Sequence, residues 1–76
     1  MYKFEFLVSW AVEGGIQTSY AYAFGRSKIE ARRKILSKIP YEADAEYKAH
    51  YTSSLNDDSV KLWYFDRSGK ECRETY

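Results

Sequence analysis

The chain has 76 residues, a formal net charge of +1, and 45% hydrophobic and 18% aromatic residues. This length predicts one domain with a small core, and a single cysteine and a single histidine exclude an internal disulfide and a structural zinc site. Stability must then come from well-packed large side chains or from self-association. Because Cys72 is unpaired and no apolar run is long enough for a membrane span, we expect a cytoplasmic protein without membrane contact.

The first two segments predict a β-hairpin. Apolar and polar residues alternate through 2–12, and again through 16–24 after a pair of glycines. A loop made of the two glycines alone would divide the aromatic side chains between the two faces of the hairpin. A three-residue loop that also includes Glu13 would place them all on one face, with Phe6 opposite Tyr22. Because the register of a half-buried hairpin follows its hydrophobic pattern, we predict the three-residue loop.

The next segment predicts a helix. Ser27 and Glu30 are spaced as a capping box, and the helix should run to about Ile39 and end before Pro40. Arg32 falls within the apolar stripe of this helix. We expect its head group to extend past the edge of the sheet, and the alternative is a contact with a carboxylate or a partner. The apolar stripe consists of Ile29, Ile35, Leu36 and Ile39, with Ala31 at its margin.

The segment 41–55 fits two structures. Tyr47 and Tyr51 have the i,i+4 spacing of a helix, but they also alternate with polar residues as in a strand. We predict a loop to about Asp44 and then a strand. Two further strands should follow, over 60–65 and from Lys70 to about Thr75, connected by a turn with glycine at its end.

The predicted element order is therefore ββαβββ, a single α+β domain over residues 1–76 with one antiparallel sheet and one amphipathic helix on one of its faces. The last three strands should form a C-terminal meander in which Tyr51 and Cys72 both lie opposite Trp63. Cys72 and His50 would then point to different faces and could not act as nucleophile and base. Because paired carboxylates and a phosphate loop are also missing, we expect a protein with no catalytic residues, no metal and no cofactor.

Charge is segregated along the chain. Residues 26–38 include six basic residues and one acid, whereas residues 41–58 include five acids and one lysine. The simplest interpretation is a solvated basic helix beside acidic loops. The alternative is a nucleic-acid-binding module that uses this helix, which the near-zero net charge and the neighbouring acids disfavour.

The aromatic residues outnumber what one short helix can cover. Some of them must lie at the rim of the sheet, on its second face or in an interface, where tyrosine and tryptophan are enriched at binding sites. A homo-oligomeric structural subunit, such as a homodimer, is the second alternative function. The predicted binding residues are three tyrosines and five cations: Tyr20, Tyr22, Tyr64, Arg26, Arg32, Arg33, Lys34 and Lys38.

The layout resembles the very small accessory proteins of bacteriophages and mobile elements. The similarity lies in the early hairpin and in the stretch 23–32, Ala-Phe-Gly-Arg-Ser-Lys-Ile-Glu-Ala-Arg, which contains Ser-x-x-Glu-Ala at a helix start. Several proteins of this kind are inhibitors of host defence, including anti-CRISPR proteins. The resemblance implies a protein that binds a host protein or ribonucleoprotein complex in the host cytoplasm and blocks it without chemistry of its own.

Overall fold

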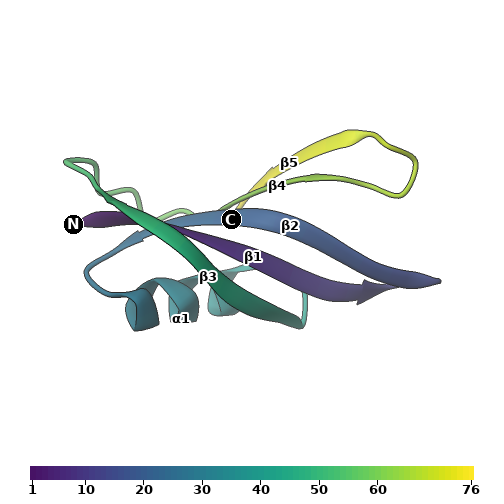
Figure 1. Ribbon diagram of the computed structural model, residues 1–76, viewed down its shortest axis with the longest axis horizontal. Helices are drawn as coiled ribbons and strands as arrows, with labels where there is room; N and C mark the ends of the chain where they lie inside the picture. The colour runs from purple at the N-terminus through teal and green to yellow at the C-terminus, as the bar shows by residue number, and fades with distance from the viewer.

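A computed structural model describes residues 1–76 and confirms the α+β class and the predicted element order. The five strands form one antiparallel sheet in the order β3-β1-β2-β4-β5. The single helix lies across one face of this sheet and leaves the other face uncovered (Figure 1). The elements are β1 Tyr2–Val12, β2 Gly15–Gly25, α1 Lys28–Lys38, β3 Ala43–Thr52, β4 Lys61–Phe65 and β5 Glu71–Thr75.

The position of β3 corrects the predicted C-terminal meander. Segment 43–52 is a strand, as predicted, but it pairs with β1, so Tyr51 lies opposite Lys3 and not opposite Trp63. Strand β1 offers an eleven-residue edge, whereas β4 has only five residues, so β3 forms the longer ladder beside β1. Strands β4 and β5 do form a hairpin, whose Asp66–Gly69 turn is closed by a hydrogen bond of 2.9 Å from the Gly69 N–H to the Asp66 carbonyl.

The register of the first hairpin differs by one residue from the predicted one. Phe6 lies opposite Ala21, because the connection is a two-residue turn of Glu13 and Gly14 and not a three-residue loop. Gly14 has a φ of +81°, a left-handed conformation that glycine adopts without steric cost. All aromatic side chains of β2 therefore point away from the aromatic side chain of Phe6.

Close packing of α1 explains this register. Strand β2 presents only small residues to the helix, namely Ala21 and Ala23, followed by Gly25. A Cβ atom at Gly25 would lie 3.4 Å from the backbone nitrogen of Ala31, which shows how closely the helix approaches the strand. Large β2 side chains on this face would force the helix outward, so the small residues take the inner positions.

The core lies between α1 and the facing side of the sheet. On the helix it contains Ala31, Ile35 and Ile39, whereas Ile29 is 68% exposed. The prediction that Ile29 belongs to the buried stripe is wrong, because two helical residues place it about 200° around the axis from Ala31. The eleven buried apolar residues are Phe4, Phe6, Val8, Trp10, Ala21, Ala23, Ala31, Ile35, Ile39, Val60 and Leu62.

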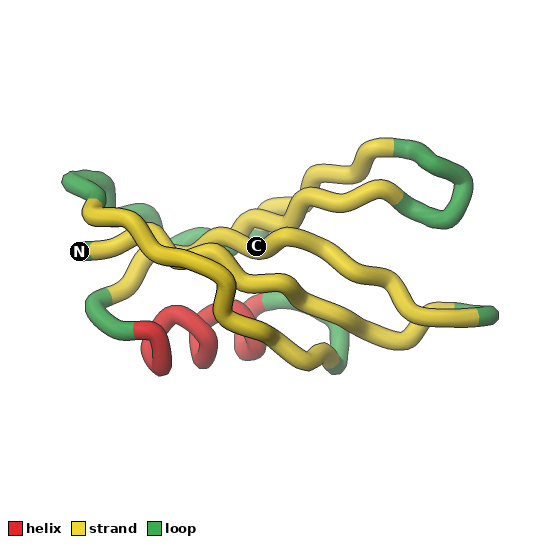
Figure 2. Tube along the Cα trace, viewed as in Figure 1, coloured by secondary structure: helices red, strands yellow, loops and turns green.

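The predicted capping residues start the helix. The Ser27 hydroxyl accepts a hydrogen bond of 3.2 Å from the Glu30 N–H. The Glu30 carboxylate accepts a second one, also 3.2 Å long, from the N–H of Arg26, one residue before the cap. The helix ends at Lys38, two residues before Pro40, and Figure 2 shows the loop that then leads into β3.

Candidate functional site

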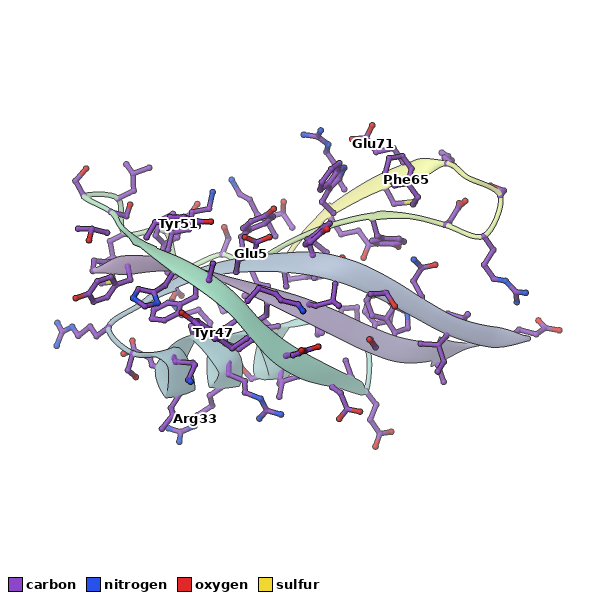
Figure 3. All side chains as sticks on the ribbon, viewed as in Figure 1. Glu5, Arg33, Tyr47, Tyr51, Phe65 and Glu71 are labelled. Atoms are coloured by element: carbon purple, nitrogen blue, oxygen red, sulfur yellow. The ribbon has the colours of Figure 1, made fainter.

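The candidate site is the sheet face that α1 leaves uncovered. The pairings of Leu7 with Tyr20, and of Tyr20 with Trp63, place side chains from three neighbouring strands on this side. Figure 3 shows Tyr51 and Phe65 on the side of the sheet away from α1. We call this surface the aromatic face; its large apolar residues are Leu7, Ile16, Tyr20, Tyr22, Phe24, Tyr51, Trp63 and Phe65.

The rings of the aromatic face form a ridge across β2 and β4. The ring centroids of Tyr20 and Trp63 lie 5.7 Å apart with an interplanar angle of 21°, and Phe65 follows at 6.0 Å from Trp63. Tyr20 remains 42% exposed and Phe65 57% exposed. The ridge borders a hollow of about 280 Å³, which Leu7 and Thr18 also line. These rings offer apolar contact area that nothing in the chain covers.

Charged side chains hold the tryptophan in place. The Glu71 carboxylate accepts hydrogen bonds of 2.8 Å from Trp63 Nε1 and from Arg73 Nε, and these two donors lower the pKa of Glu71, with Arg73 the larger cause. The Arg73 guanidinium carbon lies 5.9 Å from the Trp63 ring centroid. At the other end of the face, Lys3 Nζ lies 4.8 Å from the ring centroid of Tyr22. The aromatic face thus carries both signs of charge around fixed rings.

The helix uses two of the predicted binding cations internally. Lys34 Nζ lies 3.3 Å from one carboxylate oxygen of Asp58, and Lys38 Nζ lies 3.1 Å from the other. Lys34 also donates a hydrogen bond of 2.7 Å to the Phe24 carbonyl. The two lysines lower the pKa of Asp58, with Lys38 the larger cause. One carboxylate of the acidic loop therefore offsets part of the positive charge at the end of the basic helix.

The three arginines of the prediction occupy separate positions. Arg32 Nε donates a hydrogen bond of 3.3 Å to the Ala45 carbonyl of β3, which confirms that its head group reaches the sheet edge. Arg33 is exposed on the side of α1 away from the sheet (Figure 3). Arg26 is exposed just before the helix. None of the three lies on the aromatic face.

Tyr64 belongs to the opposite face, in contrast to Tyr20 and Tyr22. Its hydroxyl donates a hydrogen bond of 2.7 Å to Glu74, which also accepts bonds of 2.8 Å from Tyr41 and 2.9 Å from Tyr76. Although partial burial opposes the change, the three hydroxyls lower the pKa of Glu74. Tyr41 in turn stacks on Trp10 with ring centroids 4.2 Å apart. This tyrosine–glutamate cluster is a packing feature of the helix side of the sheet.

Cys72 and His50 lie on opposite edge strands, separated by three other strands. The prediction that they point to different faces is wrong, because Cys72 lies opposite Tyr64 and His50 lies opposite Phe4, and both of these partners belong to the helix side of the sheet. The strand order, and not the facing of the side chains, keeps the thiol and the imidazole apart. No group of three or more histidine, cysteine, aspartate or glutamate side chains is arranged to hold a metal ion.

Of the predicted binding residues, only Tyr20 and Tyr22 lie together on the aromatic face. The prediction did not include their neighbours Trp63 and Phe65, which complete the ridge. The signal for them was the alternation of aromatic residues with alanine in β2. A helix can pack closely on a strand only where the strand presents small side chains, so the alanines of β2 must face α1. The aromatic residues of β2, and the residues that lie opposite them on neighbouring strands, must then lie on the second face.

No protein-family model matches the chain, and neither a curated protein nor a solved structure shows a significant similarity to it. The helix of the structure lacks the length and apolar character that crossing a membrane requires.

Proposed function

We propose that this chain is a non-enzymatic binding protein that docks on another protein through its aromatic face. The observation that carries the proposal is the exposed ridge of Tyr20, Trp63 and Phe65 on an uncovered side of the sheet. Aromatic side chains in a central patch, surrounded by polar groups, are typical of residues that dominate protein–protein binding energy. The hydrogen bond from Trp63 to Glu71 fixes one ring before binding and so lowers the entropic cost of association.

The charges around the ridge favour a protein partner over a nucleic acid. Glu71 lies next to the ridge and Glu5 lies opposite Tyr22, so a phosphate backbone on this face would meet carboxylates as well as cations. The cations of this face are Lys3, Lys61 and Arg73. The basic helix lies on the other side of the sheet, and its Lys34 and Lys38 are already paired with Asp58. A protein surface with charges of both signs and an apolar centre fits these groups better.

We further propose that docking itself is the activity, as in the phage-type inhibitors that the sequence resembles. A host protein or ribonucleoprotein complex would be blocked when the aromatic face covers a surface that the complex needs. This role requires no reacting group on the inhibitor.

The test is an affinity capture from bacterial lysate with three forms of the protein, followed by mass spectrometry. The docking variant replaces Tyr20 and Phe65 by serine, and the control replaces the equally apolar Ile29 on the helix, which is 68% exposed. We expect the wild type and Ile29→Ser to capture the same protein and the docking variant to lose it. Loss of that protein from the Ile29→Ser sample, or its retention by the docking variant, would contradict the proposal.

A further inference from the structure

A second hollow lies on the helix side of the sheet, at the start of α1 and away from the aromatic face. Its volume is about 290 Å³. Strand β1, strand β3 and the β2–α1 connection converge here, and the pairing of Phe4 with His50 forms part of its wall. The hollow is lined by Tyr2, Phe4, Arg26, Lys28, Tyr47 and His50.

The basic groups of this hollow have no acidic partner. The four ion pairs of the structure involve Lys34, Lys38, Lys48 and Arg73, so Arg26, Lys28 and His50 form none. No acidic residue lines the hollow. The neighbouring Glu30 carboxylate accepts the backbone N–H of Arg26 and caps the helix. The hollow therefore combines two cations and an imidazole without internal compensation.

Aromatic contacts hold two of the three basic groups in position. Lys28 Nζ lies 4.7 Å from the ring centroid of Tyr47, and the Tyr47 hydroxyl is hydrogen-bonded to His50 Nδ1. The His50 ring also packs edge-on against Tyr2, with centroids 5.4 Å apart, and lies 5.5 Å from Phe4. When the Tyr47 hydroxyl donates to Nδ1, neutral His50 carries its hydrogen on Nε2, which is then a donor.

From this arrangement we propose that the hollow binds a phosphate monoester, with Arg26 and Lys28 supplying the positive charge and His50 a further donor. A phosphate monoester carries close to two negative charges at neutral pH and offers three acceptor oxygens, which matches this set of groups. The half-exposed ring of Tyr2 at the rim offers a flat apolar surface to the group that carries the phosphate. A nucleoside monophosphate and the 5′-phosphorylated end of a nucleic-acid strand share this chemistry.

The test is a titration of the ¹⁵N-labelled full chain, followed by the amide signals of the residues that line the hollow. The probes are AMP, inorganic phosphate, and a short thymidine oligonucleotide with or without a 5′-phosphate. We expect AMP to shift the signals of the lining residues. We also expect this binding to weaken when sodium chloride is added to the sample. Tight binding of the 5′-phosphorylated oligonucleotide but not of AMP would identify the strand end as the source of the phosphate and would also support the site.

Charge-matched variants separate this site from general attraction to a basic surface. Arg26→Gln and Lys28→Gln should each weaken AMP binding by about tenfold or more, since hydrogen bonds to charged groups contribute about 1.5–3 kcal/mol. Arg33→Gln removes the same charge from an exposed position of the helix outside the hollow and should leave the affinity unchanged. The proposal is overturned if no probe shifts the lining residues, if Arg33→Gln weakens binding as much as Arg26→Gln, or if the oligonucleotide binds equally without its phosphate. None of these variants changes a residue of the aromatic face. The titrations therefore test the hollow independently of the proposed docking.

Discussion

Phe6 and Phe65 have the same side chain, but one is buried in the core and the other is exposed to solvent. Phe6 is completely buried against α1, whereas Phe65 is 57% exposed on the aromatic face. A buried aromatic ring contributes its transfer free energy and fills volume in the core, while an exposed ring contributes little to folding. At the scale of single residues, the two sides of this sheet therefore serve different purposes.

This difference predicts unequal effects of the same substitution. Phe6→Ala should lower the free energy of unfolding by about 3–5 kcal/mol, enough to unfold most of so small a domain. Phe65→Ala should change it by about 0.5 kcal/mol or less, as for other surface positions. Urea denaturation followed by tryptophan fluorescence measures both values. Equal losses in the two variants would contradict the assignment of these residues to opposite faces.

Helix α1 shows how the surroundings of a basic element offset part of its charge. The carboxylate of Asp58 comes from the loop before β4 and contacts both Lys34 and Lys38, whose positive charges would otherwise attract polyanions. Sequence alone predicted acidic loops beside this helix. It could not predict which acid meets which lysine, because that depends on how the loop crosses the end of the sheet.

The pairing predicts a gain of polyanion binding when the acid is neutralised. Asp58→Asn should free both lysines and require more salt for elution from heparin. Asp57→Asn is the matched control, because it removes the same charge from the neighbouring residue, whose carboxylate accepts the Ser59 N–H and pairs with neither lysine. If the two variants eluted at the same salt concentration, only net charge would matter and the pairing would have no effect on the helix.

Turn chemistry and alternation were sufficient to predict every element of the chain and its two hairpins, but not the registers of these hairpins or the partner of β3. In β2 the aromatic and the alanine positions alternate equally well, and only the packing distance to α1 selects the alanine side as the inner one. The one-residue error in register followed from assigning the larger side chains to the core. It also hid the aromatic face, because the exposed ridge exists only in the observed register.

The order of the strands in the sheet also could not be predicted from local sequence patterns. A strand that follows a helix can pair with either free edge of an existing hairpin, and strand length does not decide between these two edges, because β1 and β2 both have eleven residues. Once β3 lies beside β1, the remaining chain must return past the end of the sheet to reach β2. The candidate site depends on this strand order, because Trp63 lies opposite Tyr20 only when β4 is the neighbour of β2.

At the scale of the whole molecule, the tyrosine–glutamate cluster predicts loss of stability at alkaline pH. Burial, with a contribution from Glu74, raises the pKa of Tyr41 to about 12, and burial also raises the pKa values of Tyr64 and Tyr76. In the unfolded chain tyrosine has a pKa of about 10. Above that pH the unfolded chain binds fewer protons than the folded one, so stability is fully present below about pH 10 and falls as the pH rises towards 12.

Replacing Tyr41 and Tyr64 by phenylalanine should therefore reduce the loss of unfolding free energy between pH 7 and pH 11. The matched control is the double replacement of Tyr20 and Tyr51, whose hydroxyls are not hydrogen-bonded in the structure. Denaturant titrations at the two pH values measure the difference. A cluster variant with the same loss as the wild type would show that these phenols do not account for the alkaline sensitivity.

The pairing between β2 and β4 is the shortest in the sheet. Only three residue pairs join the two strands, and beyond them the side chains of Ser19 and Gln17 donate to the carbonyls of Trp63 and Phe65 in place of backbone bonds. A single arginine, Arg67, then joins the tip of the second hairpin to that of the first through the Glu13 carbonyl. Beyond these three pairs, the β4–β5 hairpin is thus joined to the first hairpin by side-chain hydrogen bonds and not by a backbone ladder. We therefore expect Trp63 and Phe65 to adjust to a partner more readily than the side chains of β1, β2 and β3.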